Sequence, residues 1–352
     1  MTAKPRLWMR SEARPDERRA PIVPADAQRL TRQGFELSVE ESQHRVFSSP
    51  EYAAAGCRIA PAGSWPTAEP DQFIIGLKEL PESGSPLIHR HVYFGHAYKG
   101  QRGAGRLLSR FAEGGGVLLD LESLTDDGGR RLAAFGYWAG YVGASLAILH
   151  ARGQLAAPLR PLSKQELDEA VRLSQDRPVR ALVIGALGRC GRGARAALEA
   201  AAVTPLCWDL AETRQLDRAA LLDQDILVNT VLSTNPASAF LQEADLDQPG
   251  RRLSLVADVS CDPTSDCNVL PIYSQTTTWE NPIRRLRAGE RPLDLIAIDN
   301  LPSLLPVEAS TDFSAQLTPY LMTLGRDAPE WQRCARAFQQ ACPGAELEAC
   351  HV

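Results

Sequence analysis

Short apolar runs alternate with polar or amphipathic segments along most of this chain, and the alternation predicts its elements. In the first third, strands are expected at the apolar runs, with helices or loops between them. The expected strands are residues 6–10, 35–39, 72–76, 92–94 and 117–119, with one helix at 25–33 that Gly34 ends. A strand–helix rhythm of this kind is typical of an α/β domain with a parallel sheet.

The same rhythm returns after an apolar helix that is expected to begin at Phe135. Further strands are predicted at 179–184, 204–208, 225–231, 253–259 and 293–298, with a helix at 192–202. A helical segment at 312–341 follows and is expected to pack back on the first domain. We therefore predict two α/β domains, one formed by residues 1–134 with a C-terminal return at 305–352, the other by residues 135–304.

Glycines interrupt the chain directly after the strand expected at 179–184. Gly185, Gly188 and Gly191 would let the backbone approach a pyrophosphate at the start of the following helix, where N–H groups and the helix dipole favour an anion. The G-x-x-G-x-x-G spacing is a weak signal alone, because glycines after a strand often form only a turn. Asp209 strengthens it, since an acid ends the next apolar run 18 residues after Gly191. Together these features predict a nicotinamide dinucleotide site.

Composition excludes several other classes of protein. The chain has 352 residues, which suits two domains better than one core, and a net charge of −5 provides no basic field for nucleic acid or anionic membranes. Eight cysteines without a C-x-x-C pair suggest neither a disulfide framework nor a structural zinc ion. The apolar helix at 135–149 is short for a membrane span. The first residues lack a signal-peptide pattern, so we expect a cytoplasmic protein. We also expect it to bind no metal.

Polar residues gather where the strands of the first domain are expected to end. Ligands bind at this edge of an open α/β sheet, so the site is predicted there. The residues are Lys78, Glu79, His96, Lys99, Gln101, Asp120 and Glu122. On its own, a Lys–Glu pair at a strand end is more often simply solvated. His89 and His91 would share one face of a strand, as metal ligands can, but no third ligand is evident and we expect them at the surface.

Several segments resemble the NAD-dependent, lysine-forming saccharopine dehydrogenases, relatives of alanine dehydrogenase. The matching stretches are residues 76–82, 126–140, 185–191 and 298–310. Within them, Arg-Arg-x-Ala-Ala-Phe-Gly-Tyr-Trp and Leu-Pro-Ser-Leu-Leu-Pro are far more specific than a glycine loop. The resemblance implies two Rossmann-like domains with the active site in the cleft between them and NAD as the cofactor. The implied small-molecule partners are saccharopine, L-lysine and 2-oxoglutarate.

The family's reaction oxidises a secondary amine, with hydride going to NAD⁺, and then hydrolyses the imine, so it needs groups that move protons. By resemblance, Lys78 and His96 are the proton-transfer residues, and Glu79 and Glu122 are the acids that tune them. The implied substrate contacts are Arg19, Lys99, Gln101, Arg131, Phe135, Ser260, Cys261 and Asp262. The implied cofactor contacts are Arg130, Gly188, Arg189, Asp209, Thr213, Val259, Ile298, Asp299, Asn300 and Leu301.

Two departures from the family pattern keep other functions open. Asn300 stands where the family commonly has His, and Cys261 where it often has Ala, which bears on the identity of the amine. One alternative is an opine or imine reductase that joins a different amino acid to a 2-oxo acid. Another is an NAD-binding regulatory protein without catalysis, although the presence of both Lys78 and His96 argues against it. We expect a monomer or a weak homo-oligomer.

Overall fold

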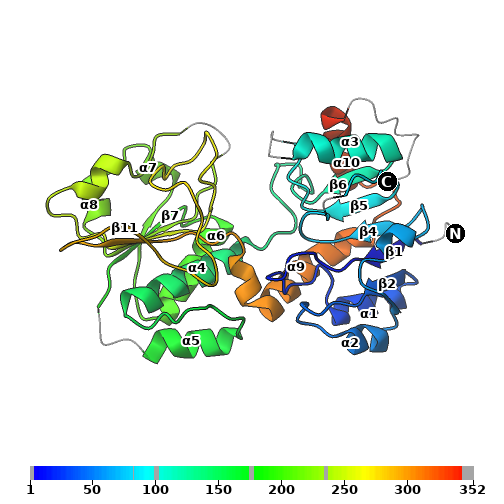
Figure 1. The fold of residues 1–352 in the computed structure, drawn as a ribbon, viewed down its shortest axis with the longest axis horizontal. Coiled ribbons are helices and arrows are strands. Elements are labelled where there is room, and N and C mark those ends of the chain that lie inside the picture. The colour runs from blue at the N-terminus through cyan, green and yellow to red at the C-terminus, as the bar shows by residue number, and fades with distance from the viewer. Residues whose placement is uncertain (1–3, 82, 99–102, 174–177, 234–236, 343–352) are drawn as a thin grey trace. The chain divides into compact units, whose positions relative to one another are not determined.

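The computed structural model describes residues 4–81, 83–98, 103–173, 178–233 and 237–342. It divides into two compact units, which Figure 1 shows as two separate sheets with their helices. Unit 1 comprises Met1–Ala134 and Ala309–Val352, and unit 2 comprises Phe135–Glu308. Each unit contains a six-stranded sheet whose strands run parallel, apart from one edge strand of unit 2. The predicted α/β class with two Rossmann-like sheets is confirmed.

The sheet of unit 1 has the strand order β3-β2-β1-β4-β5-β6, and all its neighbouring strands are parallel. Its strands are β1 (Arg6–Met9), β2 (Glu36–Glu40), β3 (Arg58–Ala60), β4 (Phe73–Ile75), β5 (Arg90–Tyr93) and β6 (Val117–Asp120). The order places β1 directly beside β4, although two strands separate them in the sequence. Segments that follow β1 and β4 therefore emerge side by side at the carboxyl edge of the sheet.

Helices cover both faces of this sheet, as in other parallel sheets. They are α1 (Pro24–Arg32), α2 (Ser49–Ala54), α3 (Ala104–Gly114), α9 (Pro306–Leu321), which crosses the boundary between the units, and α10 (Pro329–Ala341), with a 3-10 turn η1 (Trp65–Thr67). Helix α10 packs on β6 through an apolar stripe of helical spacing that contains Trp331, Cys334 and Phe338. The expected helical segment at 312–341 is thus two helices.

The sheet of unit 2 has the order β11-β12-β10-β9-β7-β8. Its strands are β7 (Ala181–Ile184), β8 (Leu206–Trp208), β9 (Ile226–Asn229), β10 (Leu255–Asp258), β11 (Arg284–Arg287) and β12 (Leu293–Ile296). The helices and 3-10 turns are α4 (Gly136–Ala151), α5 (Lys164–Leu173), α6 (Arg189–Ala200), α7 (Leu210–Thr213), α8 (Arg218–Leu222), η2 (Glu243–Asp247) and η3 (Leu301–Leu304). Strands β3 and β11 were not predicted, because neither is an apolar run.

Helices α4 and α6 approach each other closely because both present glycine at the contact. A Cβ atom at Gly140 would lie 1.9 Å from the carbonyl oxygen of Cys190, and one at Gly193 would lie 1.8 Å from that of Tyr137. Helix α4 is apolar all round and its residues from Gly140 to Leu149 are buried. This packing places α6, and with it the glycine loop that precedes α6, firmly in the core of unit 2.

The surface position that we expected for His89 and His91 is wrong. Both side chains are buried, because β5 lies between β4 and β6 with helices on both faces of the sheet. The His91 ring makes edge-to-face contacts with Trp65 and Phe111, at centroid distances of 5.1 and 5.4 Å. Burial holds the pKa of His91 well below its ordinary value, so the ring is neutral and no charge is buried.

Two further properties of the described residues bear on function. No helix among them combines the length and apolar character that crossing a bilayer requires. Within the same residues, no group of three or more His, Cys, Asp or Glu side chains is placed to share a metal ion.

Candidate active site

Three of the predicted residues meet at the carboxyl edge of the sheet in unit 1. His96 follows β5 and Glu122 follows β6, and their Nδ1 and Oε1 atoms are 3.4 Å apart. The same Glu122 oxygen lies 4.0 Å from a guanidinium nitrogen of Arg131. The His96 side chain is 53% exposed, so a ligand can reach it. Its backbone adopts the left-handed conformation, with a φ of +48°, which is uncommon for a residue other than glycine.

Acidic neighbours favour the protonated form of His96. The hydrogen bond with Glu122 raises the pKa of His96, against the opposing effect of burial, and the charge of Asp120 acts in the same direction as Glu122. Asp120 ends β6, and its Oδ1 accepts the backbone N–H of Glu122 at 2.9 Å. Burial raises the pKa of Asp120 to about 6. Asp120 was noted at this edge from the sequence, but its support of the His96–Glu122 pair was not predicted.

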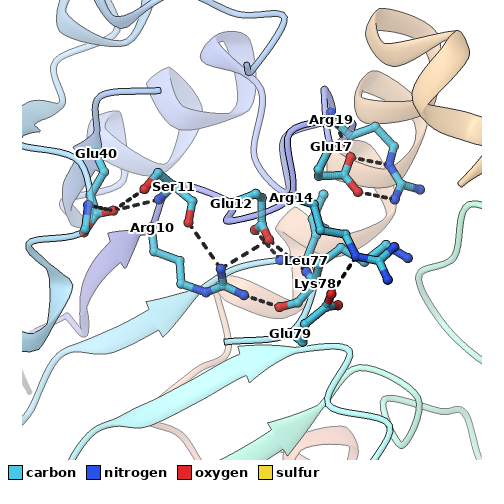
Figure 2. A network of polar contacts seen from close by, with 11 residues as sticks. Arg10, Ser11, Glu12, Arg14, Glu17, Arg19, Glu40, Leu77, Lys78 and Glu79 are labelled. Carbon is cyan, nitrogen blue, oxygen red and sulfur yellow. Dashed lines mark hydrogen bonds and ion pairs between the residues drawn. The ribbon is translucent and has the colours of Figure 1, made fainter. Parts of the chain in front are cut away.

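Lys78 follows β4, and its charge acts on two carboxylates. Burial opposes the ionisation of both Glu17 and Glu79, but nearby cations, including Lys78, lower the pKa of each. Glu79 also accepts a hydrogen bond from Nε of Arg14 at 2.5 Å (Figure 2). The charge of Lys78 also opposes the protonation of His96. The two predicted proton-transfer residues are therefore electrostatically coupled.

Glu17 holds Arg19, the predicted substrate cation, in a buried ion pair. The guanidinium of Arg19 donates from Nε and Nη2 to the two Glu17 oxygens at 2.7 and 2.5 Å, and its backbone N–H donates at 3.0 Å (Figure 2). Within residues 11–19 the sequence analysis named only Arg19, so the roles of Glu17 and Arg14 were missed. The alternation of acids and arginines there was a usable signal.

The other residues predicted near this edge do not join the cluster of His96, Glu122 and Arg131 in the described contacts. Arg130 lies in an exposed turn, where its backbone N–H donates to Oδ1 of Asp126 at 2.8 Å. Phe135 is the N-cap residue of α4 and belongs to unit 2. Lys99 and Gln101 lie outside the described residues.

The glycine loop of unit 2 has the form that a dinucleotide requires. Gly185 has a φ of +82°, and Gly188 is the N-cap of α6, whose first residue is Arg189. A Cβ atom at Gly191 would lie 2.1 Å from the carbonyl oxygen of Gly185, so only glycine permits this tight turn. The turn leaves backbone N–H groups and the dipole at the start of a twelve-residue helix for a pyrophosphate.

Asp209 lies beside this loop, at the end of β8. Its Oδ2 accepts the backbone N–H of Leu187 and its Oδ1 that of Leu210, each at 2.9 Å, which fixes the carboxylate between the loop and α7. Thr213 donates its hydroxyl to the Asp209 carbonyl at 2.9 Å. The side chains of Leu187 and Leu210 are largely exposed, an apolar surface that suits a planar base. These residues fit a dinucleotide.

The loops that follow β9 and β10 are joined by buried polar contacts. Oδ1 of Asp258 accepts from Nδ2 of Asn229 at 2.9 Å and from the backbone of Ser260 at 3.0 Å, and Oδ2 accepts from the Tyr273 hydroxyl at 2.7 Å. Ser260 also donates its hydroxyl to the Val231 carbonyl at 2.7 Å. Asp258, Asn229 and Tyr273 were missed from the sequence, and they hold the segment that contains Ser260, Cys261 and Asp262.

Three of the four predicted residues at 298–301 are buried. Ile298 and Leu301 belong to the apolar core of unit 2, and Val259, which follows β10, is partly buried against that core. Asn300 is buried and Asp299 is exposed. For Ile298 and Leu301, a cofactor contact would therefore have to come from the main chain.

Comparison with known proteins identifies the family to which this geometry belongs. The chain is 40% identical to the saccharopine dehydrogenase [NAD(+), L-lysine-forming] of Emericella nidulans, over 95% of this chain and 96% of that protein. It is 39% identical to the Schizosaccharomyces pombe protein of the same description, over 95% and 98%. The chain belongs to the saccharopine dehydrogenase family.

Wider comparisons of this saccharopine dehydrogenase family member agree on the fold. Residues 8–142 match the family model described as alanine dehydrogenase/PNT, N-terminal domain. The structure is similar to an L-alanine dehydrogenase with a TM-score of 0.67 and 14% identity, covering 97% of this chain and 99% of that one. A transhydrogenase from Sinorhizobium meliloti gives a TM-score of 0.66 at 16% identity, covering 90% and 93%.

The contact between His96 and Glu122 makes a prediction about acid–base behaviour in this family member. Replacing Glu122 with Gln should lower the pKa of His96, because the hydrogen bond and charge that raise it are removed. A raised histidine pKa stabilises the fold below the unfolded value near 6.5, and this contribution is lost as pH rises through the folded value. Glu122→Gln should therefore lose more stability at pH 5 than at pH 8.

The measurement is a pH titration of the His96 ring protons by NMR, with the resonance assigned by its absence in His96→Gln. Glu113→Gln makes the same charge change at an exposed position of α3 and serves as the control. An unchanged His96 titration in Glu122→Gln would show that the pair does not form in solution.

Proposed function

We propose that this protein oxidises saccharopine with NAD⁺ to L-lysine and 2-oxoglutarate, and catalyses the reverse reaction. The proposal rests on one observation, the cluster in which His96 is paired with Glu122 while the charge of Lys78 acts on His96, Glu17 and Glu79. Such a cluster has two groups for proton transfer with carboxylates close to them. An amine oxidation followed by imine hydrolysis requires that combination.

In the proposed mechanism, residues of unit 1 move the protons. Lys78 takes the proton of the secondary amine before hydride leaves the substrate carbon. NAD⁺, when bound, accepts that hydride. His96 then transfers protons as water adds to the imine and as the amine product departs, and Glu122 keeps the imidazole oriented and favours its protonated form.

Arginines of unit 1 are proposed to bind the substrate carboxylates. Arg19 is held rigidly by Glu17, and Arg131 presents its guanidinium close to Glu122. A planar guanidinium binds a carboxylate through two parallel hydrogen bonds, which fixes orientation as well as position. In unit 2, Gly188, Arg189, Asp209 and Thr213 are proposed to hold the cofactor. The expected cytoplasmic location and oligomeric state stay predictions.

A steady-state assay in both directions tests the proposal. With NAD⁺ and saccharopine, or with NADH, 2-oxoglutarate and L-lysine, we expect turnover in the usual range for enzymes, at about 1–10³ s⁻¹. A panel of other amino acids in place of L-lysine tests the opine reductase alternative. Binding of NADH without turnover of any amine would overturn the proposal and favour a regulatory protein.

The position of Asp209 predicts a preference for NAD(H) over NADP(H). Its carboxylate is proposed to accept hydrogen bonds from the adenosine ribose and to repel a 2′-phosphate. Asp209→Asn should reduce the ratio of kcat/KM for NAD⁺ to that for NADP⁺ by roughly tenfold or more, because a charge-assisted hydrogen bond is worth about 1–1.5 kcal/mol more than a neutral one.

Asp217→Asn is the matched control for this variant. Asp217 is also the N-cap of a short helix, and it accepts the backbone N–H of Ala220 at 3.0 Å. Asparagine caps helices about as well as aspartate, so neither variant should lose its helix. Equal kcat/KM for the two cofactors in the parent protein would contradict the prediction.

A further inference from the structure

A buried ion pair contacts the main chain at Lys78. Arg10 and Glu12 follow β1, and their Nη1 and Oε2 atoms are 3.2 Å apart. The side chains are only 1% and 7% exposed. Figure 2 shows both residues directed at the segment that follows β4, which contains Leu77 and Lys78. The pair is thus positioned by the strand order, in which β1 and β4 are neighbours.

The pair binds the backbone of Lys78 on both sides. The two Glu12 oxygens accept the N–H groups of Leu77 and Lys78, at 2.7 and 3.0 Å. Nη2 of Arg10 donates to the Lys78 carbonyl oxygen. One ion pair therefore fixes both the N–H and the C=O of the residue that carries the proposed base.

Gly76 allows Arg10 to lie across this segment. A Cβ atom at position 76 would come within 2.4 Å of Nε of Arg10 and 2.6 Å of Cζ. No side chain can therefore occupy position 76 unless the guanidinium moves. The chain has a glycine where the arginine must pass closest to the β4 segment.

Stability alone is a poor explanation for this arrangement. Removing two charges from water costs several kcal/mol per ion, and apolar replacements of buried pairs are often neutral or stabilising. The cost is visible at Glu12, whose pKa is raised because burial, together with the negative charge of Glu17, outweighs the opposing charge of Arg10 and the two backbone N–H groups. What the pair supplies in return is a fixed main-chain position.

We propose that Arg10 and Glu12 are positioning residues, a backbone clamp that holds Lys78 where its side chain can take the substrate proton. The inference rests on the proposed role of Lys78 and extends it to two residues that do not touch the substrate in this scheme. Displacing a reacting group by about 1 Å can cost roughly a hundredfold in rate. Loss of the clamp should therefore appear in kcat, with less effect on binding.

Three variants separate positioning from mere stability. Glu12→Gln and Arg10→Met each leave one buried charge without its partner, and both should lower the melting temperature. The double variant has no unpaired charge and should regain much of that stability. It lacks the Arg10 bond and one of the two Glu12 acceptor oxygens, so its kcat should stay at least about tenfold below the parent, with the KM for saccharopine and the NADH Kd within about threefold.

The matched control lies at the amino ends of the same two strands, β1 and β4. Arg6, at the start of β1, forms an exposed ion pair with Asp71, which precedes β4. Arg6→Met combined with Asp71→Asn also removes an arginine–carboxylate ion pair, without touching the backbone of Lys78. We expect its kcat to equal that of the parent.

Hydrogen exchange provides a measurement that does not depend on activity. In Glu12→Gln and in the double variant, an NH2 group replaces one of the two oxygens that accept the amides of Leu77 and Lys78, so at least one of these amides should exchange faster than in the parent. The amide of Val92 in β5 serves as the internal reference for general loosening. In Arg10→Met, which keeps Glu12, the two amides should exchange more slowly than in Glu12→Gln.

Two results would overturn the clamp. The first is a kcat that recovers together with the melting temperature in the double variant, which would make the pair purely structural. The second is unchanged exchange at Leu77 and Lys78 in Glu12→Gln. If the parent turned over neither saccharopine nor any amine of the panel, the proposed function would fail, and the exchange measurement alone would still decide whether the clamp exists.

Discussion

Replacing Lys78 with Met is expected to lower kcat by about 10²–10⁴-fold, the usual contribution of a general acid or base. His96→Gln should cause a loss of the same order, because the imine must be hydrolysed after hydride has left. Neither change touches the glycine loop or Asp209, so the NADH Kd should stay close to that of the parent. The pH profile of kcat/KM should lose one limb in each variant.

Matched controls exist in unit 2 for both substitutions. Lys164→Met removes a lysine that is paired with Asp168 at 2.6 Å, and His150→Gln removes a histidine that is paired with Asp294 at 2.9 Å. Both controls should keep the parent kcat. Because Lys78 and His96 serve one proton-transfer path, the double variant should lose less than the product of the two single losses.

A parent-like kcat in Lys78→Met would assign the base to another residue, with Glu122 the next candidate. If neither single variant changed kcat while NADH still bound, a regulatory role would become the better explanation.

Gly193→Ala is expected to destabilise unit 2 strongly. The added Cβ would lie 1.8 Å from the carbonyl oxygen of Tyr137, so α4 and α6 would have to separate. Overpacking a core typically costs about 1–3 kcal/mol, and a clash with backbone places this change at the upper end. For a domain of this size, about 3 kcal/mol corresponds to a fall of roughly 6–12 °C in Tm.

Gly105→Ala is the control for this effect. Gly105 also lies within a helix, α3, but a Cβ atom there would meet nothing within 4 Å. Alanine should stabilise that helix by up to about 1 kcal/mol, since glycine is a poor helix former. If Gly193→Ala melted at the parent temperature, the close contact between α4 and α6 would not exist.

The local pattern of the sequence predicted most of the strands in the described residues, because strands that are buried on both faces are almost continuously apolar. The pattern failed for strands made of polar residues and for polar side chains that are buried. Strand β11 is Arg-Arg-Leu-Arg, paired only at one edge, and β3 is three residues long. His91 is buried although it is polar, because a neutral imidazole among aromatic rings carries no charge into the core.

For the site, the family motifs supplied Lys78, His96 and Glu122, but they did not supply what holds them. Glu12 contacts Lys78 only because β1 pairs with β4, and nothing local in the sequence encodes that pairing. Glu17 is different, because it contacts Arg19 only two residues away and the local alternation of acids and arginines could have indicated it. Contacts between segments far apart in the chain depend on strand order, which hydrophobic periodicity does not determine.

Because the backbone at His96 is left-handed, thermal stability and activity favour different residues at this position. A residue other than glycine pays about 1–2 kcal/mol for that conformation, and asparagine or glycine adopts it more readily. A screen that selects only for heat resistance would thus favour replacing the one imidazole that the proposed chemistry needs. Engineering of this enzyme for endurance should hold position 96 fixed and seek its gains elsewhere.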